Sequence, residues 1–107
     1  MGSGATFSAV KVRVSARARR EADRAETWWR ANRPSFVDLF TRELLDVLDR
    51  LRERPDLGTL YEAARFEAPV RRILMPRTER HVYHARLGDE VVILAIWGAR
   101  RRRGPKL

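Results

Sequence analysis

The segment from Glu90 to Trp97 constrains the fold more than any other part of this sequence. Its residues, EVVILAIW, are apolar after the first position, so a strand built from them needs cover on both faces. Gly88 and Asp89 separate it from RHVYHARL at residues 80–87, which is the pattern of a β-hairpin with a two-residue turn. The strand is therefore predicted to lie inside a sheet. Strict alternation would place four of its side chains on one face: Val91, Ile93, Ala95 and Trp97.

The first half of the chain predicts a strand followed by two helices. Residues 10–14, VKVRV, alternate apolar and basic side chains as a strand does. Ser15 offers an N-cap to a helix over 16–32, and residues 35–52 repeat apolar side chains at spacings of three and four. Pro34 separates the two helices, and so short a connection predicts an antiparallel helical hairpin.

A further strand is expected over residues 65–74, where Pro69 indicates a late start or an edge position. The fold class is then α+β, with an N-terminal strand and an α-helical hairpin packed on one face of a four-stranded antiparallel sheet (β-α-α-β-β-β). Reversal at each connection predicts the strand order first, fourth, third, second, with the last strand antiparallel to the first. Two helices cover one face only, so loops, the C-terminal tail or a partner chain must cover the other.

One folded domain is expected within the 107 residues. Residues 1–9 are predicted to be a disordered N-terminus or a remnant of cloning, residues 10–98 the domain, and residues 99–107 a basic C-terminal arm. No apolar run is long enough to span a membrane, and the start lacks the pattern of a signal peptide. With no cysteine for disulfides or thiolate chemistry, a cytoplasmic location is expected.

Positive charge is the second informative feature. The formal net charge is +9, and all but two of the 23 basic residues are arginine, whose planar fork of donors suits phosphate and carboxylate. The excess lies in the C-terminal half and ends in the run Arg100–Arg103. GC-rich coding alone gives such a bias, but the distribution indicates a surface for an acidic partner. We therefore favour a functional arm over a tail that only keeps the domain soluble.

Residues typical of enzyme sites are few. His81 and His84 are the only histidines, and a spacing of three in a strand directs them to opposite faces, so no metal site is expected. The sequence has no glycine-rich phosphate loop and no recognisable Ser-His-Asp pattern, and no cofactor is expected. What remains is a set of arginines on strands near Tyr83. They form either a charged sheet edge or a basic, aromatic surface for nucleic acid or an acidic protein.

The order of the C-terminal motifs resembles the RelE/ParE superfamily of toxins from type II toxin-antitoxin modules. VRR is followed by VYHARLGD and then by VVILAIW, and the similarity extends from Val10 to about Pro105, although no single motif is strict. The resemblance implies the fold described above, with residues 10–98 as the toxin domain.

The resemblance implies one of two activities. RelE-like members cut messenger RNA in the ribosomal A site through basic residues on the sheet, assisted by a tyrosine or histidine near the C-terminus. ParE-like members inhibit DNA gyrase and lack that catalytic set. After Trp97 this chain has neither tyrosine nor histidine, and its ending, ILAIWGARR, is closer to ParE-like sequences. A gyrase inhibitor without enzymatic activity is therefore favoured over a ribosome-dependent endoribonuclease and over an inactive basic binding module.

Partners and site residues follow from the same resemblance. A growth-inhibiting or plasmid-stabilising toxin would bind gyrase, or in the alternative the ribosome and mRNA. It would be neutralised by a cognate antitoxin with an acidic, amphipathic C-terminal segment, which gains both electrostatic steering and apolar burial on a +9 chain. The candidate catalytic residues of a ribonuclease are Arg72, Arg80, His81 and Tyr83. The candidate residues for binding the target or the antitoxin are Arg71, Arg72, Arg77, Trp97, Arg100, Arg101, Arg102 and Arg103.

Overall fold

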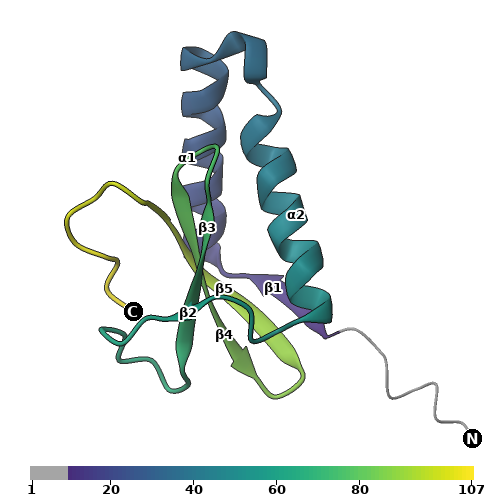
Figure 1. The fold of residues 1–107 in the computed structure, drawn as a ribbon, viewed down its shortest axis with the longest axis vertical. Coiled ribbons are helices and arrows are strands. Elements are labelled where there is room, and N and C mark those ends of the chain that lie inside the picture. Colours follow the sequence, from purple (N-terminus) through teal and green to yellow (C-terminus); the bar gives the residue numbers. More distant parts are fainter. Residues whose placement is uncertain (1–9) are drawn as a thin grey trace, which may run out of the picture.

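Two helices pack on one face of a five-stranded sheet in the computed structural model, which describes residues 10–107 (Figure 1). The expectation for residues 1–9 lies outside the described residues. The elements in chain order are β1 (Lys11–Val14), α1 (Ala16–Asn32), the 3₁₀ helix η2 (Pro34–Phe36), α2 (Leu39–Glu53), β2 (Thr59–Leu60), β3 (Val70–Met75), β4 (Arg80–Leu87) and β5 (Glu90–Gly98). The predicted α+β class is confirmed. No helix in this part of the chain is long and apolar enough to cross a membrane.

The sheet order is β1-β5-β4-β3-β2, so β5 lies between two strands as its apolar faces predicted. The prediction of four antiparallel strands was wrong, because β1 pairs with β5 in parallel, with Lys11 opposite Glu90 and Val14 opposite Ile93. The physical reason is β2, which has only two residues and pairs antiparallel with β3. This extra reversal of the chain inverts the direction of every later strand relative to β1.

The capping residue and the apolar spacing of the sequence predicted both helices, with small differences at the start of the second. α1 has the predicted bounds, and the Ser15 side chain caps it by accepting a hydrogen bond from the Ala18 N–H at 3.1 Å. The second helix begins at Leu39 rather than residue 35, because Pro34–Phe36 close a separate 3₁₀ turn first. The strand expected over 65–74 is β3, which starts directly after Pro69, so the late start is confirmed and residues 61–69 are loop.

A β-bulge in β5 changes which side chains share a face. Tyr83 lies opposite Ala95 and His84 opposite Ile93, which leaves Leu94 without a partner on β4. Strict alternation was therefore wrong beyond Ile93. Val91, Ile93 and Ile96 belong to the cluster beneath the helices, whereas Ala95 belongs to the cluster on the other face, and Trp97 packs against that cluster.

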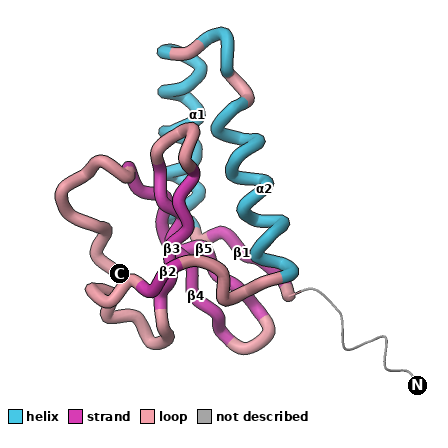
Figure 2. Tube along the Cα trace, in the orientation of Figure 1, coloured by secondary structure: helices cyan, strands magenta, loops and turns pink. Residues whose placement is uncertain are grey.

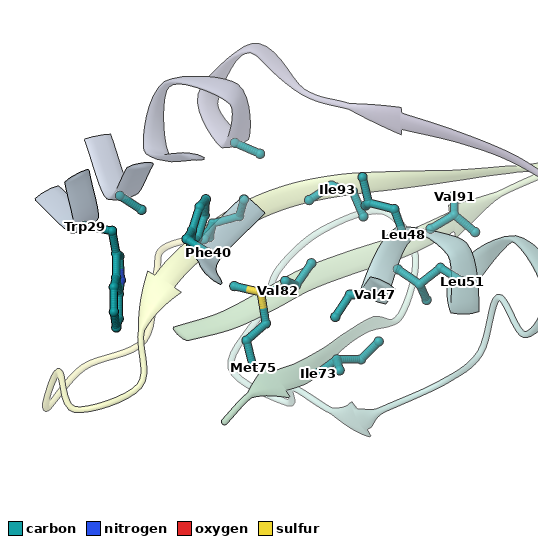
Figure 3. Packing of buried hydrophobic residues seen from close by; sticks show 13 residues of the cluster. Trp29, Phe40, Val47, Leu48, Leu51, Ile73, Met75, Val82, Val91 and Ile93 are labelled. Atoms are coloured by element: carbon teal, nitrogen blue, oxygen red, sulfur yellow. The ribbon is translucent and has the colours of Figure 1, made fainter. Parts of the chain in front are cut away.

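The sheet carries a hydrophobic cluster on each face. On the helix side, Trp29, Phe40 and Leu51 pack onto Met75 and Ile93, with Trp29 at the end of the cluster (Figure 3). Burial of one such large apolar side chain is worth about 1.5–3 kcal/mol. The second cluster has a core of four buried residues: Val70, Tyr83, Ala85 and Ala95. Tyr61, Phe66 and Leu107 pack on it, so the loop after β2 and the C-terminal segment cover it. Figure 2 shows both segments as loops on one side of the sheet.

Glu43 on α2 ties the helical hairpin to the β3–β4 turn. One carboxylate oxygen accepts from the Thr78 N–H at 3.0 Å and the Thr78 hydroxyl at 2.6 Å, and the other accepts from the Arg77 N–H at 2.9 Å. Thr78 is buried, so its polar groups have no access to water. The contact fixes the position of this turn beside the helices.

Substitution Glu43→Ala leaves two buried donors of Thr78 unsatisfied, and we expect it to lower the free energy of unfolding by about 2–3 kcal/mol. The matched control on the same helix is Asp46→Ala, which removes a surface ion pair with Arg50 and should cost less than about 1 kcal/mol. Urea denaturation followed by circular dichroism measures both. Equal losses would show that Glu43 contributes no more than a surface charge.

Candidate functional site

A hollow of about 530 Å³ lies where the end of α1, the β3–β4 turn and the end of β5 meet. Figure 1 shows this turn reaching up beside α1. A second hollow of about 330 Å³ continues from it along α1. The two hollows share Trp28, Arg80, Gly98 and Arg101, and together they form what we call the α1–β5 groove. The groove forms because Glu43 holds the turn beside the helices and because β5 packs against α1.

Arginines dominate the lining of the first hollow: Arg33, Arg77, Arg80, Arg100 and Arg101. Glu79 is the one carboxylate there, and it accepts two hydrogen bonds from the Arg100 guanidinium, at 2.7 and 3.1 Å. Arg24 and Glu21 line the second hollow. The groove is therefore positively charged, and such a surface favours anionic groups.

Arg80 lies on the helix side of the sheet. Its guanidinium donates to the Thr78 carbonyl at 3.0 Å and lies 5.7 Å from the centre of the Phe40 ring. Burial is the main cause that lowers the pKa of Arg80, and the neighbouring Arg101 lowers it further. Both causes penalise the charged guanidinium, and an anion placed beside Arg80 would stabilise that charged form by attraction.

Three tryptophans border the groove, each in a different way. Trp28 is 44% exposed, with the guanidiniums of Arg33 and Arg80 at 5.7 and 5.9 Å from its ring centre. Trp97 has Arg101 at 4.1 Å and Arg17 at 5.7 Å from its ring. These distances are those of cation–π contacts. Trp29 is only 8% exposed, and its buried indole N–H finds no acceptor in residues 10–107.

Three of the four candidate catalytic residues meet on the opposite face of the sheet. The Arg72 guanidinium donates to the Tyr83 hydroxyl at 3.3 Å, and the His81 and Tyr83 rings have centres 6.0 Å apart. Tyr83 is 1% exposed, covered by Tyr61 in an edge-to-face contact at 4.9 Å. Burial is the main cause that lowers the pKa of His81, and Arg72 adds to it. Arg80 does not join this group, because its side chain lies on the helix side.

The C-terminal arm folds back along the second face. The Trp97 indole donates to the Arg103 carbonyl at 2.7 Å, the Tyr61 hydroxyl donates to the Pro105 carbonyl at 3.0 Å, and the Arg17 guanidinium donates to the Lys106 carbonyl at 2.8 Å. Pro105 is buried. The backbone of the arm is thus held in place, while the side chains of Arg100–Arg103 remain exposed.

The remaining binding candidates lie apart. Arg71 donates to the Gly58 carbonyl at 3.2 Å, away from the α1–β5 groove, whereas Arg77 reaches the groove from the turn. Sequence reasoning missed Trp28, Trp29 and Arg33 as lining residues. A signal existed: adjacent residues on a helix point about 100° apart, so the pair Trp28-Trp29 had to place one ring outside the core.

The two histidines lie on opposite faces, as their spacing predicted. His81 is paired with Trp97 on the second face, and His84 with Ile93 on the helix side. His84 Nε2 lies 2.8 Å from the Leu57 carbonyl oxygen and therefore carries the proton and donates. Its Nδ1 is buried without a partner among the described residues.

Comparison with known proteins places the fold. No protein-family model matches the chain, and no curated protein matches it. Among solved structures, the chain is similar to one described as "Chromosomal ParDE TA system from P. aeruginosa", with a TM-score of 0.68 and 14% sequence identity. The similarity covers 83% of this chain and 95% of that chain. At this identity the likeness shows a shared fold.

The pKa of His84 is lowered mainly by burial, with Arg71 lowering it further, while the hydrogen bond to Leu57 and the charge of Asp56 act in the opposite direction. The unfolded chain then binds a proton at His84 more readily than the folded one. The free energy of unfolding should therefore be retained above the unfolded histidine pKa of about 6.5 and should fall as the pH drops below it.

Denaturation at a series of pH values tests this with His84→Gln, whose amide can still donate to Leu57. We expect the variant to lose less stability on acidification than the wild type. His81→Gln is the comparison variant: the pKa of His81 is lowered too, but His81 is less buried than His84, so this variant should retain more of the wild-type loss than His84→Gln does. If both variants follow the wild-type curve, buried His84 does not cause the acid sensitivity.

A side chain at residue 104 tests the docking of the arm, because a Cβ there would collide with the Tyr61 hydroxyl. In Gly104→Ala we expect tryptic cleavage within Arg100–Arg103 to become about tenfold faster, which corresponds to about 1.4 kcal/mol of local stability. Gly98→Ala is the control, since its Cβ would meet Arg101 at an ordinary 3.6 Å. Mass spectrometry of the fragments gives the rates. Equal rates in wild type and Gly104→Ala would mean that the arm is not docked.

Proposed function

We propose that this chain is the toxin of a type II toxin-antitoxin module, that it inhibits growth by inhibiting DNA gyrase without enzymatic activity of its own, and that a cognate antitoxin neutralises it. The observation that carries the proposal is the fold likeness to a chain of a ParDE TA system, which extends over 95% of that chain. The RelE/ParE resemblance of the C-terminal motifs supports the same assignment independently of the structure.

The arrangement of the candidate catalytic residues favours gyrase inhibition over RNA cleavage. In-line attack by a ribose hydroxyl needs an acid or base and a cationic group that reach the same phosphate. Here Arg80 lies on the other side of the sheet from His81, and the Tyr83 hydroxyl is buried and already bound by Arg72. Of the four candidates, His81 and Arg72 are left on that face, and Tyr83 is buried away from a substrate.

The exposed arginines supply the surface for a target protein. Because the arm is held by its backbone carbonyls, the guanidiniums of Arg100–Arg103 extend from a fixed support rather than from a mobile tail. A preorganised basic surface of this kind loses less conformational entropy on binding than a flexible one. In this proposal the arm and Trp97 contact gyrase, and the acidic segment of the antitoxin competes for the same charge.

The test is a supercoiling assay with purified gyrase on relaxed plasmid. We expect the wild-type protein to abolish supercoiling or to trap cleaved DNA, and the cognate antitoxin to reverse this. The matched control is His81→Gln, which removes the accessible acid or base among the ribonuclease candidates and should inhibit gyrase as the wild type does. Growth arrest with unaffected gyrase, accompanied by cleaved mRNA on ribosomes and lost in His81→Gln, would contradict the proposal and establish the ribonuclease.

A further inference from the structure

The outer face of α2 carries a strip of exposed side chains that starts at the N-cap of the helix. The members of this strip alternate at spacings of four and three residues, which average the 3.5-residue repeat of a helix that packs against another helix. They are Asp38, Arg42, Leu45, Asp49 and Arg52, and all five are exposed. Leucine is usually buried, yet Leu45 at the centre of the strip is 53% exposed. The strip therefore has the pattern of a helix–helix contact that lacks its second helix.

The charges of this strip are antisymmetric about Leu45. Along the chain they are negative and then positive before the leucine, and again negative and then positive after it. Asp38 and Arg52 each lie seven residues from Leu45, which is about 10.5 Å along the helix axis. Arg42 and Asp49 lie three and four residues from it, at about 4.5 and 6 Å. Each charge thus has a charge of the opposite sign at nearly the same distance on the other side of Leu45.

This arrangement fits a second copy of the same helix that runs antiparallel. The two Leu45 side chains then meet at the centre, Asp38 lies opposite the partner's Arg52, and Arg42 lies opposite the partner's Asp49. A two-fold axis beside Leu45 forms each of these contacts twice. A parallel, in-register pair would instead place every charge opposite its own equivalent, and like charges that face each other repel. The strip is therefore complementary to itself in the antiparallel orientation and not in the parallel one.

The charged groups of the strip are available for such a contact. Asp38 and Arg42 form no ion pair within residues 10–107. Asp49 and Arg52 pair with each other along the helix, but 74% and 44% of their side-chain surfaces remain exposed. So exposed a pair contributes little by itself. In the antiparallel arrangement, the partner's Arg42 and Asp38 would join this pair in a network of four charges.

The net charge of +9 opposes the association of two copies, but α2 does not carry this excess. From residue 38 to residue 53, three arginines stand against five carboxylates, so this segment has a net charge of −2. None of the five residues of the strip lines the α1–β5 groove, where arginines are concentrated. A contact through α2 therefore brings together the least positive surfaces of the two chains.

We propose that the outer face of α2 binds a second copy of this chain in an antiparallel, two-fold arrangement centred on Leu45. The contact is only one helix wide, so the dimer is a reversible one at the lower end of the range of interface sizes. Burial of the two Leu45 side chains stabilises it, and the charge pairs fix its orientation. The proposal is independent of the proposed function, because it follows from α2 alone.

Sedimentation velocity of the full chain over a concentration series tests the contact. We expect the sedimentation coefficient to rise with concentration, and Leu45→Glu to weaken the self-association about tenfold or more. The matched control is Leu74→Glu, which introduces the same charge at a leucine of similar exposure, 47%, on β3. It should associate as the wild type does. Circular dichroism checks that both variants are folded, as their exposed positions lead us to expect.

A charge exchange tests the orientation. Arg42→Asp alone and Asp49→Arg alone each place like charges opposite each other in a dimer of identical chains, so each variant should associate more weakly than the wild type. An equimolar mixture of the two variants restores opposite charges at both contacts, and we expect it to associate about tenfold or more tightly than either variant by itself.

Three results would overturn the proposal. The first is a wild-type chain that stays monomeric at every concentration, and the second is equal weakening by Leu45→Glu and Leu74→Glu. The third is tighter association of Arg42→Asp alone, since this would show that α2 binds the basic surface of another copy head to tail. Gyrase inhibition by a chain that stays monomeric would leave the proposed function standing, whereas a dimer that does not inhibit gyrase would leave only the α2 contact.

Discussion

The double-sided burial of β5 is the constraint on which the rest of the structure depends. A strand that is apolar on both faces cannot face water, so it needs two covers. The helical hairpin provides one, and the loop after β2 together with the C-terminal arm provides the other. The arm is therefore part of the fold: Pro105 is buried, and three carbonyl groups of the arm accept hydrogen bonds from Trp97, Tyr61 and Arg17. The backbone of the arm is bound to the domain, and the side chains of Arg100–Arg103 are exposed to solvent.

The positive surface arises from how the chain uses its carboxylates. Glu43 holds the β3–β4 turn, Glu21 accepts from the backbone of β5, and Glu79 binds Arg100. Each of these groups is already engaged, so none is free to neutralise the remaining arginines of the α1–β5 groove, Arg100 excepted. Because these carboxylates bind groups within the domain, most of the groove's arginines remain available to an acidic partner.

Much of the fold could be predicted, because several of its elements follow from patterns of neighbouring residues in the sequence. The helix α1, the hairpin of β4 and β5 and the interior position of β5 follow from periodicity, a Ser15 cap and a Gly-Asp turn. The parallel pairing of β1 could not be predicted, since it depends on β2, whose two residues have no periodicity to detect. The bulge at Leu94 likewise has no recognisable sequence pattern. Because of it, Trp97 lies on the opposite face of the sheet from Ile93.

The candidate site was only partly predictable. The arginines of the arm and Arg77 were expected at a binding surface. Which arginines lie close together depends on segments distant in the sequence, so the sequence could not show that Arg80 lines the groove and that Arg71 does not. Trp28 and Trp29 are neighbours in the sequence, yet Trp28 is exposed and Trp29 carries a buried N–H without an acceptor among the described residues. Burial and hydrogen-bond accounting, rather than residue type, identify the groove.

The central claim is that the target is gyrase rather than the ribosome, and co-sedimentation tests it most directly. The full chain would be centrifuged with purified gyrase and, separately, with ribosomes, at low and high salt. We predict that it sediments with gyrase, that rising salt weakens this association, and that it remains in the supernatant with ribosomes. Sedimentation with ribosomes and not with gyrase would contradict the account.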